Sequence, residues 1–310
     1  MRIAVSLGAE PLGVFRPPAE VAQDAVTAEA EGFGSAWMTH MTRGVDALTT
    51  LALAASLTSR IDLGVGVVPT YPRHPHALAQ QAATVQALAG GRLTLGVGVS
   101  HRPVVEGQLG LSYARPAEHL REYLSVLVPL LRDGSVSFEG DHYTVDGGFS
   151  VPGTAPVDVL VGGMGPRTVD VAGRYADGLV TWLAGRRVVA EEIAPALRAA
   201  ASDAGRPAPR LVVALPVCVS ADPDAARAAA ATVFARYEGL ANYQHLLARQ
   251  DDARPADLAL VGDEDAVAAQ VARVADAGAT ELWAIPFAPD ADPAAAARTR
   301  RLLADLAAGA

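Results

Sequence analysis

The sequence has a single cysteine in 310 residues, and only 5% of its residues are aromatic. One cysteine excludes an internal disulfide, and because Cys218 lies in the apolar run LVVALPVCVS we expect a core thiol, not a nucleophile. No apolar run reaches the ~18 residues that a membrane-spanning helix needs. No long basic run accompanies the net charge of −9. These absences argue against a membrane or a nucleic acid as a partner.

Several functional motifs are also missing. The seven histidines include no His-x-x-x-His pair with a partner carboxylate, so no metal site is expected. The absence of a G-x-S-x-G elbow disfavours an α/β-hydrolase. The first residues, MRIAVSLGAE, resemble a strand and are too soon interrupted for a signal peptide, so we expect a cytoplasmic protein.

What the sequence does contain is an alternation of short apolar runs with helix-like segments, in a composition that is 51% hydrophobic. Continuous apolar runs are typical of parallel strands buried on both faces. Two helix patterns begin at Pro75 and Pro116 and end at Gly90 and Gly134. Eight strand–helix units predict one α/β domain over residues 1–310, a (β/α)8 TIM barrel with insertions. The predicted strands are Arg2–Leu7, Ser35–Met38, Asp62–Val67, Leu93–Val99, Val157–Gly162, Gly178–Thr181, Arg210–Val219 and Glu281–Ile285.

Two segments depart from this alternation. Residues 134–156 combine alternating polarity, aromatic residues and glycine-rich turns, which predicts a hairpin-like insertion. Residues 221–278 hold two helix patterns separated by the loop DDARPADLALVGD, which predicts an enlarged helical seventh unit with a part near the barrel mouth.

Polar residues follow the ends of predicted strands, where α/β barrels build their active sites. His40 follows the second strand, and a functional and a structural role are equally open for it. His119 lies on a helix pattern and is expected to pack or to lie at the surface, and His142 belongs to the insertion and is expected to be exposed. After the third and fourth strands come Thr70, Tyr71, Arg73, His74, Ser100 and His101.

The glycine-rich turn VGGMGPR at 161–167 follows the fifth strand and precedes a helix. Glycines allow close approach of an anion, and the amides at a helix start point toward it. A tight strand-to-helix turn is an equally open interpretation of this motif alone. The neighbouring strand ends at Ser100 and His101, and two adjacent loops with free amides favour a phosphate site.

At these positions the sequence resembles the luciferase-like monooxygenase superfamily, and within it the coenzyme F420-dependent oxidoreductases. The resemblance covers most of the chain, in order. Its main pieces are GVGVVPTYPRHP at 64–75, GGRLTLGVGVSH at 90–101 and LVGGMGPRTVDVAGRYADGLVTW at 160–182.

The resemblance implies a TIM barrel that binds F420, a deazaflavin that transfers hydride. It implies a bulge beneath the cofactor ring at Gly66, Val67 and Val68, with a cis peptide between the first two. Tyr71 and His74 would shape the wall of the pocket, and His40 would be the catalytic residue. The cofactor phosphate would meet Ser100, His101, Gly162, Gly163 and Met164. We expect Arg73, Arg102 and Arg167 near the mouth to balance the anionic phosphate and tail.

The favoured interpretation is an F420-dependent oxidoreductase acting on a small organic substrate. An FMN-dependent monooxygenase and a non-catalytic flavin- or deazaflavin-binding barrel are the alternatives. By analogy with the superfamily we also expect a homodimer.

Overall fold

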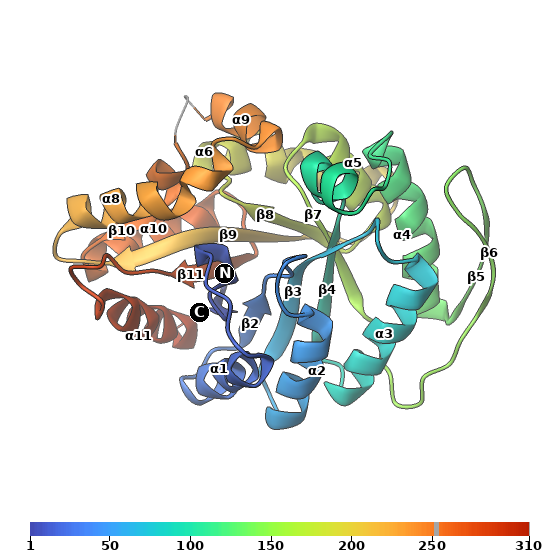
Figure 1. Ribbon diagram of the computed structural model, residues 1–310, viewed down its shortest axis with the longest axis horizontal. Coiled ribbons are helices and arrows are strands. Elements are labelled where there is room, and N and C mark those ends of the chain that lie inside the picture. The colour runs from blue at the N-terminus through green and yellow to red at the C-terminus, as the bar shows by residue number, and fades with distance from the viewer. Residues whose placement is uncertain (251–253, 310) are drawn as a thin grey trace.

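The computed structural model describes residues 1–250 and 254–309 and shows a closed parallel barrel surrounded by helices (Figure 1). The barrel strands are β1 (Arg2–Leu7), β2 (Ser35–Met38), β3 (Asp62–Pro69), β4 (Leu93–Gly98), β7 (Asp158–Gly162), β8 (Gly178–Trp182), β9 (Arg210–Val219) and β11 (Glu281–Pro286). They neighbour one another in the order β1–β2–β3–β4–β7–β8–β9–β11, and β11 pairs with β1. The predicted TIM barrel is confirmed, and all eight predicted strands are present.

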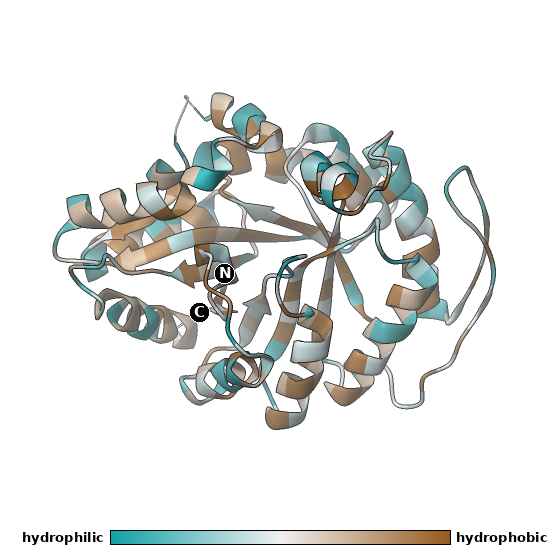
Figure 2. Ribbon diagram, in the orientation of Figure 1, coloured by the Kyte–Doolittle hydropathy of each residue, from teal (hydrophilic) through white to brown (hydrophobic). Residues whose placement is uncertain are grey.

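The strands are buried on both faces, as their continuous apolar runs indicate. In β9, Leu211, Val213 and Leu215 join the core between barrel and helices, and Val212 and Ala214 face the barrel interior. Figure 2 shows the same division, with apolar strands inside and polar residues on the outer faces of the helices. Cys218, also on β9, is fully buried, as predicted, and burial raises the pKa of its thiol to about 11.

Most of the helices begin at a proline or at an aspartate cap. A proline opens α1, α3, α4, α5 and α8 in the first turn, where its missing N–H is not needed. Asp46 caps α2 by accepting the N–H of Thr49 at 2.9 Å. Gly134 ends α4 in the left-handed conformation. The bounds are α1 (Pro18–Ala30), α2 (Ala47–Leu57), α3 (Pro75–Leu88), α4 (Pro116–Asp133), α5 (Pro166–Tyr175), α6 (Arg186–Val188), α7 (Ala194–Asp203), α8 (Pro223–Phe234), α9 (Ala241–Ala248), α10 (Glu264–Asp276) and α11 (Ala295–Ala308).

An antiparallel hairpin, β5 (Ser135–Glu139) and β6 (Thr144–Gly148), occupies the segment where the sequence predicts one. It projects from the edge of the barrel beside α4 (Figure 1). The buried carboxylate of Glu122 on α4 fixes its turn by accepting the backbone N–H of His142 at 2.7 Å.

The segment between β9 and β11 contains α8, α9 and α10, together with a short strand, β10 (Leu260–Gly262), that the sequence pattern does not predict. This strand pairs with β9 outside the closed barrel. The predicted loop begins at residues 251–253, which lie outside the described residues.

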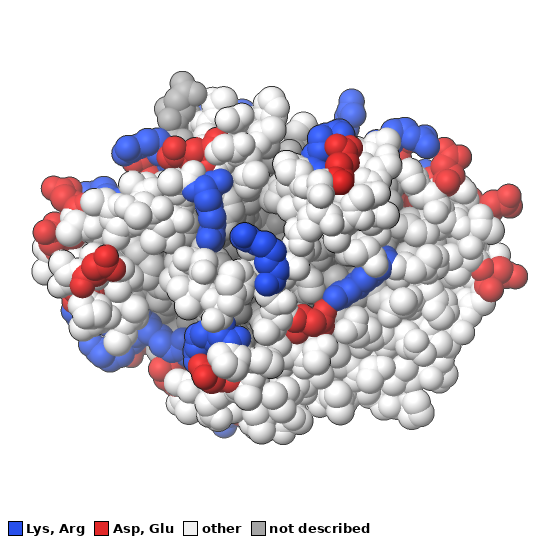
Figure 3. All heavy atoms as spheres, in the orientation of Figure 1, with Lys and Arg blue, Asp and Glu red and all other residues white. Residues whose placement is uncertain are grey.

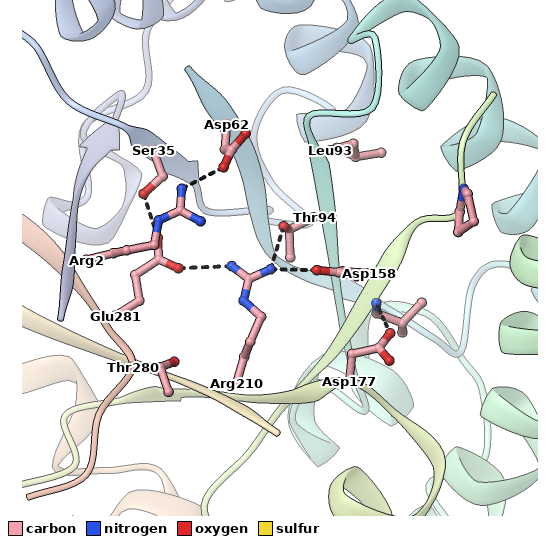
Figure 4. A network of polar contacts seen from close by, with 12 residues as sticks. Arg2, Ser35, Asp62, Leu93, Thr94, Asp158, Asp177, Arg210, Thr280 and Glu281 are labelled. Atoms are coloured by element: carbon pink, nitrogen blue, oxygen red, sulfur yellow. Dashed lines mark hydrogen bonds and ion pairs between the residues drawn. The ribbon is translucent and has the colours of Figure 1, made fainter. Parts of the chain in front are cut away.

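A polar network lies at the end of the barrel where the strands begin (Figure 4). The Glu281 carboxylate, 1% exposed, accepts hydrogen bonds from Ser35 at 2.6 Å, Trp37 at 3.0 Å and Arg210 at 2.9 Å. Arg210 also contacts Asp158 at 2.9 Å. Because each buried charge has several partners, we infer that the residues at this end of the barrel stabilise the fold.

The two termini lie at this same end. Met1, Arg2 and Ala307 line one small surface pocket, and N and C are neighbours in Figure 1. Within residues 1–250 and 254–309, no helix is both long and apolar enough to cross a membrane.

Candidate functional site

A cavity of about 1830 Å³ lies at the opposite end, where the strands terminate. Its lining comes from the residues that end or follow β2, β3, β4, β7, β8 and β11, and from α4, α5 and α9. Figure 3 shows a hollow in the molecular surface with basic side chains around it. A large concave site at the strand ends of a TIM barrel is the expected location for ligand binding.

Most of the predicted site residues meet in this cavity. They come from four separate strand ends, and the fold alone brings them together. Those that line it are His40, Gly66, Val67, Ser100, His101, Gly162, Gly163 and Met164.

Part of the cavity wall is the Val67 side chain, which lies against two glycines, Gly98 and Gly162. We call this arrangement the glycine cradle. The pairing of β3 with β4 shifts between Val65 and Val68, which forms the predicted bulge, and the Gly66–Val67 peptide is cis, as the resemblance implied. A Cβ on Gly98 would approach Val67 Cγ2 to 2.8 Å, and one on Gly162 would approach Val67 Cγ1 to 2.7 Å. Only glycine at these two positions leaves room for the Val67 side chain.

Tryptophans form the floor beneath the bulge. Trp283 lies against Gly66, where an added Cβ would meet its ring at 2.4 Å, and it stacks on Trp37 with ring centroids 5.5 Å apart. Trp182 contacts Phe234 and Tyr237 edge-on from the other side of the cavity. Nothing in the sequence marks these side chains as site residues.

His40 lines the cavity with a side chain that is 9% exposed. Its Nδ1 accepts the backbone N–H of Ala47 at 3.4 Å, at the first turn of α2. Asp46 Oδ2 lies 4.0 Å from the same nitrogen, but that carboxylate is already held by Thr49 and Arg73. Burial and the nearby Arg73 guanidinium lower the pKa of His40 to about 4, so the imidazole is neutral at physiological pH.

The turn at 162–168 offers an anion part of the predicted set of amides, Met164 among them, but not the amide of Gly163. The Gly163 N–H is used by the Val180 carbonyl at 3.1 Å. An added Cβ on Gly163 would meet Thr168 Cγ2 at 2.4 Å, so this glycine is required by packing inside the turn. The amides that remain for an anion in the described chain are those of Met164, Gly165 and the first turn of α5.

Arginines give the cavity a positive lining within a negatively charged protein. Two of the three predicted ones are engaged elsewhere: Arg73 pairs with Asp46, and Arg102 pairs with Glu106. Of the three predicted arginines, only Arg167 lines the cavity. The arginines among the described lining residues are Arg43, Arg115, Arg121, Arg167, Arg236 and Arg249, against two carboxylates, Glu118 and Asp170.

Three residues predicted for the site do not line the cavity. The Val68 side chain is fully buried in the core outside the barrel. His74 is exposed and caps α3. Tyr71 stands behind the wall, stacked on His119 at 4.0 Å and on Tyr113, which does line the cavity.

His119 and His142 take part in packing, whereas His245 on α9 is exposed and lines the cavity. His119 is 5% exposed and its Nε2 is hydrogen bonded to Thr70 Oγ1 at 3.0 Å, so it is a packing residue. His142 packs edge-on against His119 and is partly buried, not exposed as expected. Among the described residues, no three metal-ligating side chains gather into a group.

The comparisons with known proteins agree with this geometry. A family model described as luciferase-like monooxygenase matches residues 1–281. The chain therefore belongs to the luciferase-like monooxygenase family, and it is an enzyme of the oxidoreductase class.

Two relatives illustrate the sequence similarity. An F420-dependent glucose-6-phosphate dehydrogenase of Beutenbergia cavernae is 34% identical over 253 residues, which cover 80% of this chain and 70% of the relative. A 5,10-methylenetetrahydromethanopterin reductase of Methanolobus tindarius is 29% identical over 218 residues, covering 69% of this chain and 65% of the relative. The second match thus spans just under two thirds of that reductase.

Solved structures share the fold over the whole chain. An F420-dependent secondary alcohol dehydrogenase in complex with an F420–acetone adduct superposes with a TM-score of 0.81 at 19% identity, covering 98% of this chain and 97% of that one. The oxygenating constituent of a Pseudomonas putida Baeyer–Villiger monooxygenase in complex with FMN gives 0.74 at 19% identity, covering 100% and 98%. At these identities the likeness establishes the fold alone.

Proposed function

We propose that this protein is an F420-dependent oxidoreductase that transfers a hydride between the deazaflavin and a small organic molecule. The observation that carries the proposal is the glycine cradle around Val67, opening onto an arginine-lined cavity. The F420-dependent relatives support it. The cavity volume of about 1830 Å³ speaks against a non-catalytic barrel filled by its own side chains.

The residues present fit such a cofactor. The bulge at Gly66 and Val67 provides an apolar surface for a flat ring. Ser100, His101 and the amides of Met164 and Gly165 would hold a phosphate. When bound, the deazaflavin supplies a carbon that gives or accepts hydride. His40, at the edge of the same cavity, is the catalytic residue that would contact the reacting substrate.

The arginines favour F420 over FMN. F420 carries an anionic tail beyond its phosphate, and Arg43 and Arg167 line the cavity without forming an ion pair in the described chain. A longer anion uses more of this positive lining than FMN does. We therefore expect F420 to bind more tightly, by a margin that shrinks as salt is raised.

Side-by-side titration of the purified protein with F420 and FMN tests this proposal. Quenching of cofactor fluorescence gives both dissociation constants, at low and high salt. Equal or tighter binding of FMN, together with oxygen consumption by the reduced FMN complex, would support the monooxygenase alternative instead.

We also propose that the protein acts as a homodimer. Leu53 and Leu57 on α2 and Leu88 on α3 are 40%, 49% and 54% exposed, which leaves apolar side chains on two helices outside the barrel. Sedimentation velocity at micromolar concentration should give a dimer mass, and a monomer would reject the idea.

A further inference from the structure

Directly after β4, the backbone acceptors are occupied and the backbone donors are free. The Ser100 carbonyl accepts the Tyr113 hydroxyl at 3.1 Å. The His101 carbonyl accepts the N–H groups of Val104 at 2.9 Å and Val105 at 3.0 Å. The N–H groups of Ser100 and His101 donate to no acceptor in the part of the chain that the structure describes, and both residues line the cavity. Free amides beside occupied carbonyls are suited to an anion.

Ser100 holds an uncommon backbone conformation. Its φ of 59° lies in the left-handed region, which residues with a Cβ seldom adopt. Turns that contain such a residue can bring successive N–H groups to one concave side, where anions bind. Because a serine does not prefer this conformation, contacts with the surrounding structure must hold it.

The side chain that contacts this turn, Tyr113, is itself firmly placed. It is 8% exposed, and its ring stacks on Tyr71 with ring centroids 5.5 Å apart. The Arg102 guanidinium carbon lies 5.1 Å from the centre of the same ring. The Tyr113 N–H reaches Glu106 Oε1 at 3.4 Å, and that carboxylate pairs with Arg102. The hydroxyl therefore reaches the Ser100 carbonyl from a fixed position.

A hydrogen bond on the Ser100 carbonyl also controls the amide beside it. This carbonyl and the His101 N–H belong to one planar trans peptide unit, so they point in opposite directions. Fixing the carbonyl therefore fixes the direction of the N–H. The hydrogen bond also polarises the peptide, which makes the N–H a stronger donor.

We propose that Tyr113 is a positioning residue of the anion site, and that its hydroxyl holds the Ser100–His101 peptide in the orientation that receives the phosphate of the bound cofactor. Tyr113 acts through the Ser100 carbonyl and does not itself bind the phosphate. This inference rests on the proposed function for the identity of the cofactor. It predicts that Tyr113 matters for ligands that carry a phosphate and not for those that lack one.

The free amide can be observed without any cofactor. Protein labelled with ¹⁵N at the histidine backbone nitrogen gives one amide signal per histidine, and His101→Gln identifies the signal of His101. Titration with inorganic phosphate should shift this signal in the parent protein. Tyr113→Phe should need about tenfold more phosphate for the same shift, the effect of one lost hydrogen bond. A signal that phosphate does not move, or moves equally in both proteins, would overturn the proposal.

Two ligand pairs then separate positioning from a general structural role. One is F420 and its chromophore without phosphate and tail, and the other is FMN and riboflavin, which differ only by the phosphate. Tyr113→Phe should weaken the phosphate-bearing member about tenfold and leave the other within about twofold. Equal losses for both members, or no loss for either, would contradict the proposal. If FMN binds and F420 does not, the proposed function fails, and the flavin pair still tests Tyr113.

Tyr71→Phe is the matched control for these measurements. It removes a hydroxyl from the ring stacked on Tyr113, but that hydroxyl has no partner in the described chain, and Tyr71 does not line the cavity. We expect this variant to bind phosphate and all four ligands within about twofold of the parent. If Tyr71→Phe lost as much affinity as Tyr113→Phe, the effect would come from packing of the two rings, and the proposal would be wrong.

Discussion

His40 and His119 are both buried and both neutral, but they face different surroundings. His40 is held by the N-terminus of α2 and opens onto the cavity. His119 is enclosed by Tyr71 and Thr70 behind the cavity wall. Burial, followed by the nearby His142, lowers the pKa of His119 to about 4. Only His40 can therefore take part in chemistry, whereas His119 affects stability.

The low pKa of His119 predicts a loss of stability in mild acid. In the unfolded chain the ring takes up a proton near pH 6.5, but in the folded chain only near 4. Its stabilising contribution is thus fully present above pH 6.5 and is lost as the pH falls through 4. The limit is about 3 kcal/mol, at 1.36 kcal/mol per pKa unit. Urea unfolding at pH 7.5 and 4.5 should show a smaller loss for His119→Gln than for the parent. Equal losses would contradict the assignment.

Gly163 and Gly165 form a matched pair within one turn. A Cβ on Gly163 would meet Thr168 at 2.4 Å, whereas one on Gly165 would meet nothing within 4 Å. We expect Gly163→Val to abolish F420 binding, because the turn must move to admit the side chain. Gly165→Ala should change the affinity less than about twofold. Fluorescence titration measures both, and normal binding by Gly163→Val would refute the geometry.

At the scale of elements, the bulge of β3 depends on its neighbours β4 and β7. Val67 fits only because Gly98 and Gly162 lack a Cβ. Gly162→Ala should therefore destabilise the protein by about 1–3 kcal/mol through overpacking. In a Val67→Ala background, which removes both γ-methyl groups, the same change should cost less than about 1 kcal/mol. Denaturant unfolding of the four proteins closes this cycle. If the losses in stability from the two substitutions were additive, the side chains at positions 67 and 162 would not be in contact.

Helices and strands could be predicted from the sequence where the apolar pattern was long or was bounded by proline and glycine. Continuous apolar runs predicted the eight barrel strands, and prolines and glycines marked the bounds of α3 and α4 closely. The three-residue strand β10 has no such pattern, because Leu260–Gly262 becomes a strand only through its pairing with β9. Its structure is decided by a tertiary contact that the local sequence does not contain.

For the whole molecule, the two ends of the barrel have separate tasks. Charges at the strand starts pair with one another, whereas at the strand ends Arg43 and Arg167 line the cavity without an ion pair in the described chain. We expect Arg210→Leu to destabilise the protein by about 3 kcal/mol, because it leaves the buried Glu281 without its cation. F420 affinity of the folded variant should not change. Adding Glu281→Gln should recover part of the stability, and urea unfolding with cofactor titration tests both statements.

The site was only partly predictable, for a reason that also concerns the whole molecule. Glycines and polar residues next to a strand end carry a local signal, and they led to Ser100 and Gly163, whereas Gly66 came from the family resemblance. Trp283 and Trp182 lie inside apolar strands, where nothing in the sequence tells a floor residue from a core residue. Arg236 and Arg249 come from a distant helical segment, and only the fold brings them to the mouth.

The arginine lining has a practical consequence. The 25 basic residues of this sequence are all arginine. Reagents that acylate amines therefore find no lysine side chain to modify in this sequence, and they leave the arginine lining of the cavity intact. Reagents that react with guanidinium groups would instead remove the positive charge around the ligand site.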